Sequence, residues 1–290
     1  MQLDIFNDSR DVMLRNDVLS ALQQYDAAGA RRALQALAGD YPDDTALVDF
    51  GSIVGALESR STVLFDRHEA ALQARQALSR EVQPALARVF PGQTGTAWLA
   101  PLWAELAGRA AALPFRADRA DAHAASLFLL AARWDKACEA VSRVASWRRI
   151  PAPLCWMTEA RYRLDGLDAA WPLLVELAWL SPSLLDPLLR RLDDACINRL
   201  LRAFDTSFDG PGDIGDRAWF PAWALTEKAG LAPLFRQAEP SRQNAPERAA
   251  KMMLELLSLE RQGRHHELLE TRRALQALNA ALYAAYMKTR

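Results

Sequence analysis

Apolar residues recur every three to four positions along most of this chain, which is the pattern of one buried face of an α-helix. Ser, Asp, Thr and Pro stand just ahead of many of these runs, where helices begin. From this pattern we predict roughly a dozen helices and no strand. The predicted helices include residues 9–25, 27–40, 61–90, 96–113, 117–132 and 246–263. We expect Pro84 to kink the longest of them, because proline removes a backbone donor.

Two of the apolar runs align at a spacing of 33 residues. In each run a small residue is followed by large apolar residues four and seven positions later. The matched positions are Ala137, Val141 and Val144 in the first run and Ala170, Leu174 and Leu177 in the second. A period of this length in a helical chain indicates stacked helix pairs, because one pair cannot bury its apolar face alone.

These positions resemble the end of a tetratricopeptide (TPR) repeat, in which a proline follows five residues after the last apolar position. The residues that fit are Ala30, Leu34, Leu37 and Pro42, and again Ala170, Leu174, Leu177 and Pro182. The aromatic, Leu-Gly and Tyr signature of the first repeat helix is absent from the chain. The resemblance implies an all-α, TPR-like helical repeat array, an α-α superhelix, and a compact helical bundle is the alternative.

The clearest irregular segment is Asp205–Asp216, which contains Gly210-Pro211-Gly212 and Gly215. Long loops in helical arrays mark a lobe boundary or a functional insertion. We therefore divide the chain into a helical repeat array over residues 1–204 and a C-terminal helical segment over residues 217–290, which continues the first or forms a second lobe. Four aspartates in this loop lack the alternating spacing and closing Glu of an EF-hand, so we interpret the loop as a connector that proteases cut first.

Composition narrows the class of protein. The chain has 290 residues, of which 51% are apolar and 24% charged, as in ordinary folded proteins. The formal net charge of −1 and the dispersed arginines count against nucleic acid as a partner. The first residues have no apolar core of a signal peptide, and no apolar run is long enough for a membrane span. We expect a cytoplasmic protein, of bacterial character because Arg greatly outnumbers Lys.

One acidic run could serve an enzyme. Asp43, Asp44 and Asp49 resemble the aspartate-rich motif of all-helical isoprenyl-diphosphate synthases, in which carboxylates hold Mg²⁺ and a diphosphate. Pro42, however, places these acids at a helix start, where Asp caps the helix and complements its dipole. We favour the capping interpretation and keep a metal-dependent diphosphate enzyme as the alternative function.

Aromatic and basic residues near predicted turns are the candidate binding residues, because Trp and Arg dominate binding hot spots. They are Trp147, Arg148, Arg149, Trp219 and Trp223. Neither the four histidines nor the three cysteines show metal-ligand spacing, and no nucleophile motif is present. We expect a non-catalytic scaffold, an adaptor, chaperone or assembly factor, that binds another protein or peptide with no cofactor and no metal. A nucleic-acid-binding solenoid is the third possibility, and the residues do not indicate an oligomeric state.

Overall fold

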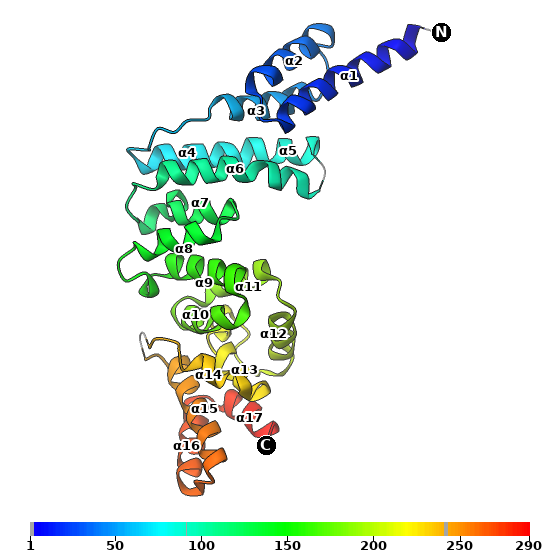
Figure 1. The fold of residues 1–290 in the computed structure, drawn as a ribbon. Coiled ribbons are helices and arrows are strands. Elements are labelled where there is room, and N and C mark those ends of the chain that lie inside the picture. The colour runs from blue at the N-terminus through cyan, green and yellow to red at the C-terminus, as the bar shows by residue number, and fades with distance from the viewer. Residues whose placement is uncertain (1–2, 91, 241–242) are drawn as a thin grey trace. The chain divides into compact units, whose positions relative to one another are not determined.

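Every regular element that the structure describes is helical (Figure 1). The structure is a computed structural model that describes residues 3–90, 92–240 and 243–290. The absence of strands in these residues confirms the all-α prediction. The chain divides into two compact units: unit 1 ends at Arg133, and unit 2 spans Trp134–Arg290. The predicted boundary at residues 205–216 therefore lies inside unit 2.

Unit 1 contains seven α-helices, one π-helical turn (η1) and one 3-10 turn (η2) in its described residues. These elements are α1 (Leu3–Gln23), α2 (Ala27–Asp40), α3 (Leu47–Glu58), α4 (His68–Ala77), η1 (Leu78–Val82), α5 (Gln83–Val89), α6 (Gln93–Ala110), η2 (Ala117–Ala122) and α7 (Ala124–Leu130). Helices that follow one another pack together: α1 on α2, α2 on α3, and α6 on α5 and α7.

Helix α2 shows how the apolar pattern becomes packing. Asp26 caps the helix by accepting a hydrogen bond from the Gly29 amide at 2.9 Å. Ala30, Leu34 and Leu37, the residues of the TPR-like pattern, form its buried face and are at most 6% exposed. The sequence prediction of both the bounds and the buried face of this helix is confirmed.

The segment before α4 differs from the prediction. A helix was expected from Ser61, but α4 begins at His68, and residues 61–65 are extended along the end of α6. The Ser61 amide donates to the Glu105 carboxylate at 2.7 Å, and the Phe65 amide donates to the Arg109 carbonyl at 2.9 Å. Contacts with α6 therefore replace the hydrogen bonds that a helix would have made. We call residues 60–65 the strap.

The long helix from His68 to Val89 is interrupted just before Pro84, where the sequence predicted a kink. One π-helical turn, η1, separates α4 from α5 and places Pro84 in the first turn of α5. A π turn inserts one extra residue into a helix and rotates the faces on either side.

Unit 2 contains ten α-helices and three 3-10 turns in its described residues. These elements are α8 (Trp134–Ser142), η3 (Trp147–Arg149), α9 (Pro151–Asp165), α10 (Leu167–Leu180), α11 (Pro182–Leu192), α12 (Ala195–Ser207), η4 (Ile214–Ala218), α13 (Phe220–Glu227), η5 (Ala229–Leu231), α14 (Ala232–Phe235), α15 (Ala245–Gln262), α16 (His265–Leu278) and α17 (Ala280–Lys288). The first of the two runs that align at 33 residues falls on α8 and the turn after it, where Val144 lies, and the second falls on α10; the matched positions are all buried.

Aromatic side chains fill the interior of unit 2. The ring centroid of Phe204 lies 5.4 Å from that of Trp223 and 5.7 Å from that of Phe220, both edge to face. Trp171 packs on Phe220 and, at 6.0 Å, on Phe235. Edge-to-face pairs of this kind add to the stabilisation from burying the rings. No helix in the described residues combines the length and the apolarity needed to cross a lipid bilayer.

Candidate functional site

The turn between α8 and α9 carries three of the candidate binding residues. Ser146 has a left-handed backbone with φ of 54°, which reverses the chain direction after Val144. The 3-10 turn η3 follows, and its Arg149 amide donates to the Ser146 carbonyl at 2.8 Å. Pro151 then starts α9. This tight geometry places Trp147 and Arg148 side by side on the surface of unit 2.

Trp147 and Arg148 line a cavity of about 380 Å³ between α8, α9 and α10. Its floor is apolar: Met157 and Leu173 are 6% and 5% exposed, and Pro172 is buried beside them. Arg161 of α9 also lines the cavity, so two guanidinium groups border it. The cavity therefore combines an apolar floor, an indole ring and positive charge.

Arg148 is held in place by two carboxylates and a ring. Its guanidinium lies 5.3 Å from the ring centroid of Trp147, which is a cation–π contact. Its Nη1 donates to the carboxylate of Glu239, and its Nε lies 3.6 Å from Oε2 of Glu176. The side chain is still 30% exposed. Arg148 is thus oriented by the protein and remains accessible from the cavity.

Glu176 connects this site to the segment that follows α14. The residue lies on α10, is 3% exposed, and accepts a hydrogen bond from the Glu239 amide at 2.8 Å. Asn244 fastens the same segment by donating to the Trp179 carbonyl at 2.9 Å. Burial raises the pKa of Glu176 to about 7, although the Glu239 amide and Arg148 both act in the opposite direction.

The other two tryptophans of the predicted set do not line this cavity. Trp223 is 1% exposed and packs in the aromatic interior on α13. Trp219 is half-buried at the N-terminal end of α13, and Arg149 is exposed next to Arg148. The structure places Trp147 and Arg148 at the cavity, whereas Arg149, Trp219 and Trp223 are not part of its lining. The binding role of the five residues stays a prediction.

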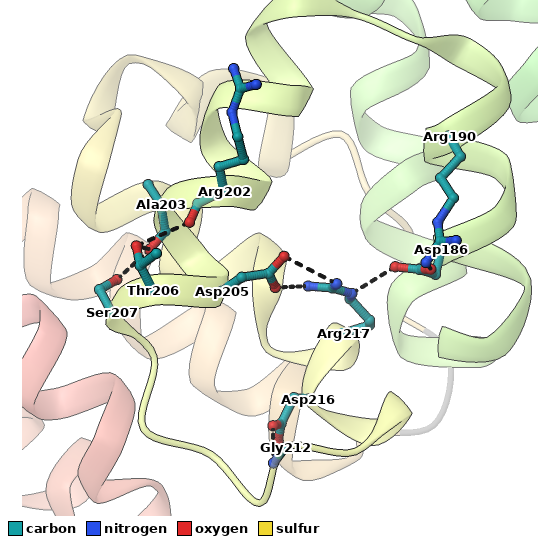
Figure 2. Close-up of polar contacts among 10 residues, drawn as sticks. All are labelled: Asp186, Arg190, Arg202, Ala203, Asp205, Thr206, Ser207, Gly212, Asp216 and Arg217. Atoms are coloured by element: carbon teal, nitrogen blue, oxygen red, sulfur yellow. Dashed lines mark hydrogen bonds and ion pairs between the residues drawn. The ribbon is translucent and has the colours of Figure 1, made fainter.

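The irregular segment Asp205–Asp216, which we call the acidic loop, is shorter than the sequence predicted and is held by more contacts. Helix α12 continues to Ser207 and η4 starts at Ile214, so only residues 208–213 are irregular. Figure 2 shows Arg217 between two aspartates: its Nε donates to Asp186 at 2.8 Å, and its Nη atoms contact Asp205.

Two further aspartates close the loop itself. Asp216 accepts a hydrogen bond from the Gly212 amide at 2.7 Å (Figure 2), and Asp213 accepts one from the Gly215 amide at 2.7 Å. Gly210 lies so close to Asp216 that an added Cβ would be 2.5 Å from its Oδ1 atom. Three of the loop's four aspartates, Asp205, Asp213 and Asp216, therefore bind protein donors.

The acidic run in unit 1 is engaged in a similar way. Asp44 accepts from Arg15 at 2.7 Å and from the Ala46 amide at 2.8 Å. Burial alone would raise the pKa of Asp44, but these two hydrogen bonds lower it. Asp49 binds Arg88 through two hydrogen bonds, of 2.7 and 2.6 Å, which lower its pKa. Asp43 is exposed. Among the described residues, no three His, Cys, Asp or Glu side chains are grouped to hold a metal ion.

Sequence reasoning missed Glu176, Glu239 and Arg161 as parts of the candidate site. For Glu176 a signal existed, because it is the single charged residue in the apolar run from Trp171 to Leu180. A lone carboxylate on a buried helix must find a partner, which points to a polar contact at that position. Nothing local marks Glu239, because its contacts lie 63 and 91 residues earlier in the chain.

Comparisons with models of protein families, with curated proteins and with solved structures give no match to this chain.

Proposed function

We propose that the protein is a non-catalytic, TPR-like helical scaffold that binds another protein or a peptide in the cavity beside Trp147 and Arg148. The observation that carries the proposal is the combination found there: an apolar floor, an indole ring and two guanidinium groups on an accessible surface. Trp and Arg are the residues that contribute most to binding energy at interfaces. The proposed scaffold needs no catalytic group.

The residues of the cavity suggest what kind of partner would fit. A bulky apolar side chain would enter between Met157 and Leu173, and a neighbouring carboxylate or backbone carbonyl would bind Arg148 or Arg161. The TPR-like arrangement is supported by helices that pack on their sequence neighbours, such as α8 on α9 and α9 on α10. We place the scaffold in the cytoplasm because Cys138, Cys155 and Cys196 are free thiols, as is usual in a reducing compartment.

A peptide-selection experiment tests the proposed function. Peptides are selected from a random displayed library on the full chain, and their affinity is then measured by fluorescence anisotropy. We expect Trp147→Ala and Arg148→Gln to weaken binding by about 30-fold, the effect of losing a hot-spot residue.

Two variants outside the cavity serve as matched controls. Trp134→Ala and Arg143→Gln change residues of the same types that do not line the cavity, and both should bind as the wild type does. Circular dichroism checks that each variant is folded. The proposal is wrong if no peptide is selected, or if the selected peptides bind Trp147→Ala as tightly as the wild type.

A further inference from the structure

A second and larger cavity lies in unit 1, between α3 on one side and α4 with η1 on the other. Its volume is about 590 Å³, within the range of roughly 300 to 1,000 Å³ that is usual for small-molecule sites. Helix α3 packs on η1 and α5, and α6 lies beneath α4 (Figure 1). We call this cavity the α3–α4 groove.

The floor of the groove is apolar. Leu102 and Leu106 of α6, together with Leu78 and Val82 of η1, line it and are each at most 9% exposed. The serines of α3 add little polarity, because Ser52 and Ser59 donate their hydroxyl hydrogens to carbonyls of their own helix. An aliphatic chain placed here would therefore lose contact with water without covering an unpaired polar group.

Two glycines keep the α3 wall of the groove open. Gly51 and Gly55 lie in the middle of α3, where glycine is less favourable for a helix than alanine. A Cβ added to either would meet no atom within 4 Å, so close packing does not require a glycine at either position. On the opposite wall, Ala74 and Ala77 are also small. Because these residues are small, they leave the space between α3 and α4 empty.

Positive charge is concentrated at one end of the groove. Arg60 follows α3, and Arg109 lies in the last turn of α6. Arg60 binds Glu105 through Nε at 2.8 Å, and Arg109 binds the Val63 carbonyl through Nε at 2.9 Å while stacking on Phe65 at 4.1 Å. Glu105 of α6 thus fixes Arg60, and the strap fixes Arg109. With one carboxylate between two guanidinium groups, this end carries a net charge of about +1.

The other charged residue of the lining is Glu81, which is exposed on η1. It follows Ala77 by four residues on the α4 side and is not part of the Arg60–Glu105–Arg109 group. The groove therefore has an apolar interior and one positive end, an arrangement complementary to an amphiphilic anion.

We infer that the α3–α4 groove binds a medium- or long-chain carboxylate, with the aliphatic chain along Gly51 and Gly55 and the carboxylate at Arg60 and Arg109. The stretch of α3 from Val48 to Ser59 is about 16 Å long at 1.5 Å per residue, which gives room for an extended chain. This site lies in unit 1 and is independent of the peptide cavity proposed in unit 2.

Isothermal titration calorimetry of the full chain with octanoate, decanoate and dodecanoate, all below their micelle concentrations, tests the inference. We expect one site per chain and an affinity that rises about fourfold for each added methylene, the effect of burying a CH₂ group. Decyltrimethylammonium has the same chain and the opposite charge, and it should bind at least tenfold more weakly than decanoate.

Variants locate the binding site. Gly55→Leu fills the groove and should weaken dodecanoate binding more than tenfold while leaving the melting temperature unchanged or higher. Gly39→Leu is its matched control, because Gly39 also lies on a helix with open space around it but outside the groove. Ala77→Leu fills the groove from the opposite wall and should cause the same loss of dodecanoate binding. This variant therefore tests the site even if Gly55→Leu disturbs α3.

Charge variants test the head-group end. Arg60→Gln and Arg109→Gln should each weaken decanoate binding roughly fivefold, the loss of one charge-assisted hydrogen bond. Arg80→Gln, an exposed arginine on η1 that does not line the groove, should have no effect. The inference is overturned if dodecanoate shows no saturable binding, if Gly55→Leu and Ala77→Leu both bind as the wild type does, or if the cationic amphiphile binds as tightly as decanoate.

Discussion

Units 1 and 2 are both built from helices, but they differ in how far side chains fill the space between those helices. In unit 1 the small side chains of α3 and α4 leave a groove of about 590 Å³. In unit 2 the rings of Trp171, Phe204 and Trp223 fill the interior, and two surface cavities there are smaller, about 380 and 410 Å³. The difference shows that one helical chain can fill the space between its helices with bulky residues in one unit and leave it open with small residues in the other.

The two units also differ in their buried ionisable groups. In unit 1, burial lowers the pKa of His123 to about 4, and the nearby His68 acts in the same direction. His123 is therefore neutral at pH 7, and its neutral Nδ1 accepts the Ala125 amide at 3.2 Å. In unit 2 the pKa of Glu176 is raised to about 7. Acid should therefore destabilise the environment of His123, whereas alkali should destabilise that of Glu176.

The largest expected effect is the loss of an aromatic side chain from unit 2. Trp223→Ala should lower the free energy of unfolding by about 3 to 5 kcal/mol, because it leaves a large cavity in the interior. Trp147→Ala, which removes a half-buried indole at the surface, should lower it by less than about 1 kcal/mol. Urea denaturation followed by circular dichroism measures both. Equal losses would show that the interior of unit 2 relaxes around the missing ring.

The next effect concerns the ion pairs that anchor the acidic loop. Arg217, whose side chain is 19% exposed, binds both Asp186 and Asp205. Arg217→Met should lower stability by about 2 to 3 kcal/mol, because it leaves two carboxylates without this partner, and it should speed proteolysis within residues 208–213.

Arg190→Met is the control for Arg217→Met. Arg190 pairs with the same Asp186 but is 78% exposed, and exposed pairs contribute less than about 0.5 kcal/mol. A similar loss in the two variants would mean that the loop is not anchored by Arg217.

A smaller effect should depend on pH. The folded-state pKa of Glu176, about 7, lies above the ordinary carboxyl value, so its stabilising contribution is present at low pH and is lost as pH rises through about 7. The stability of Glu176→Gln relative to that of the wild type should therefore rise by about 2 kcal/mol between pH 5 and pH 8. The exposed Glu255→Gln should follow the wild type at every pH. Parallel curves of unfolding free energy against pH for the wild type and Glu176→Gln would contradict the raised pKa of Glu176.

The smallest effects should have opposite signs in the two units. Gly51→Ala should stabilise α3 by about 0.5 to 1 kcal/mol, because the backbone is helical and the space is empty. Gly166→Ala, between α9 and α10, should destabilise unit 2 by about 1 kcal/mol, because its φ of 82° is unfavourable for a residue with a Cβ. Thermal denaturation measures both. A destabilising Gly51→Ala would show that this glycine is needed by the fold.

Much of the helical framework could be predicted from the sequence, because apolar spacing within a helix is a local signal. The buried faces of α2, α8 and α10 follow from residues three or four positions apart. Ser61 was misread as a helix start because its competing partner, Glu105, lies 44 residues later in the chain. The loop after Phe204 looked longer than it is, because α12 continues to Ser207 and three of the loop's four aspartates bind protein donors.

The candidate site was predictable only in part. Trp147 and Arg148 were selected because Trp and Arg near a turn favour binding, and they do line one cavity. Trp223 was selected on the same grounds, but it is buried against Phe204, which lies 19 positions earlier on another helix. The α3–α4 groove gave no positive signal at all, since it depends on side chains that are absent at Gly51 and Gly55.

At those two glycines, selection for thermal stability and selection for an open groove would favour different residues. If the groove has a ligand, the substitutions that make α3 more heat-resistant are the same ones that close its site. A library of variants screened only for survival at high temperature should accumulate alanine or larger residues at positions 51 and 55. A library screened for ligand retention should keep glycine there and gain its heat resistance elsewhere.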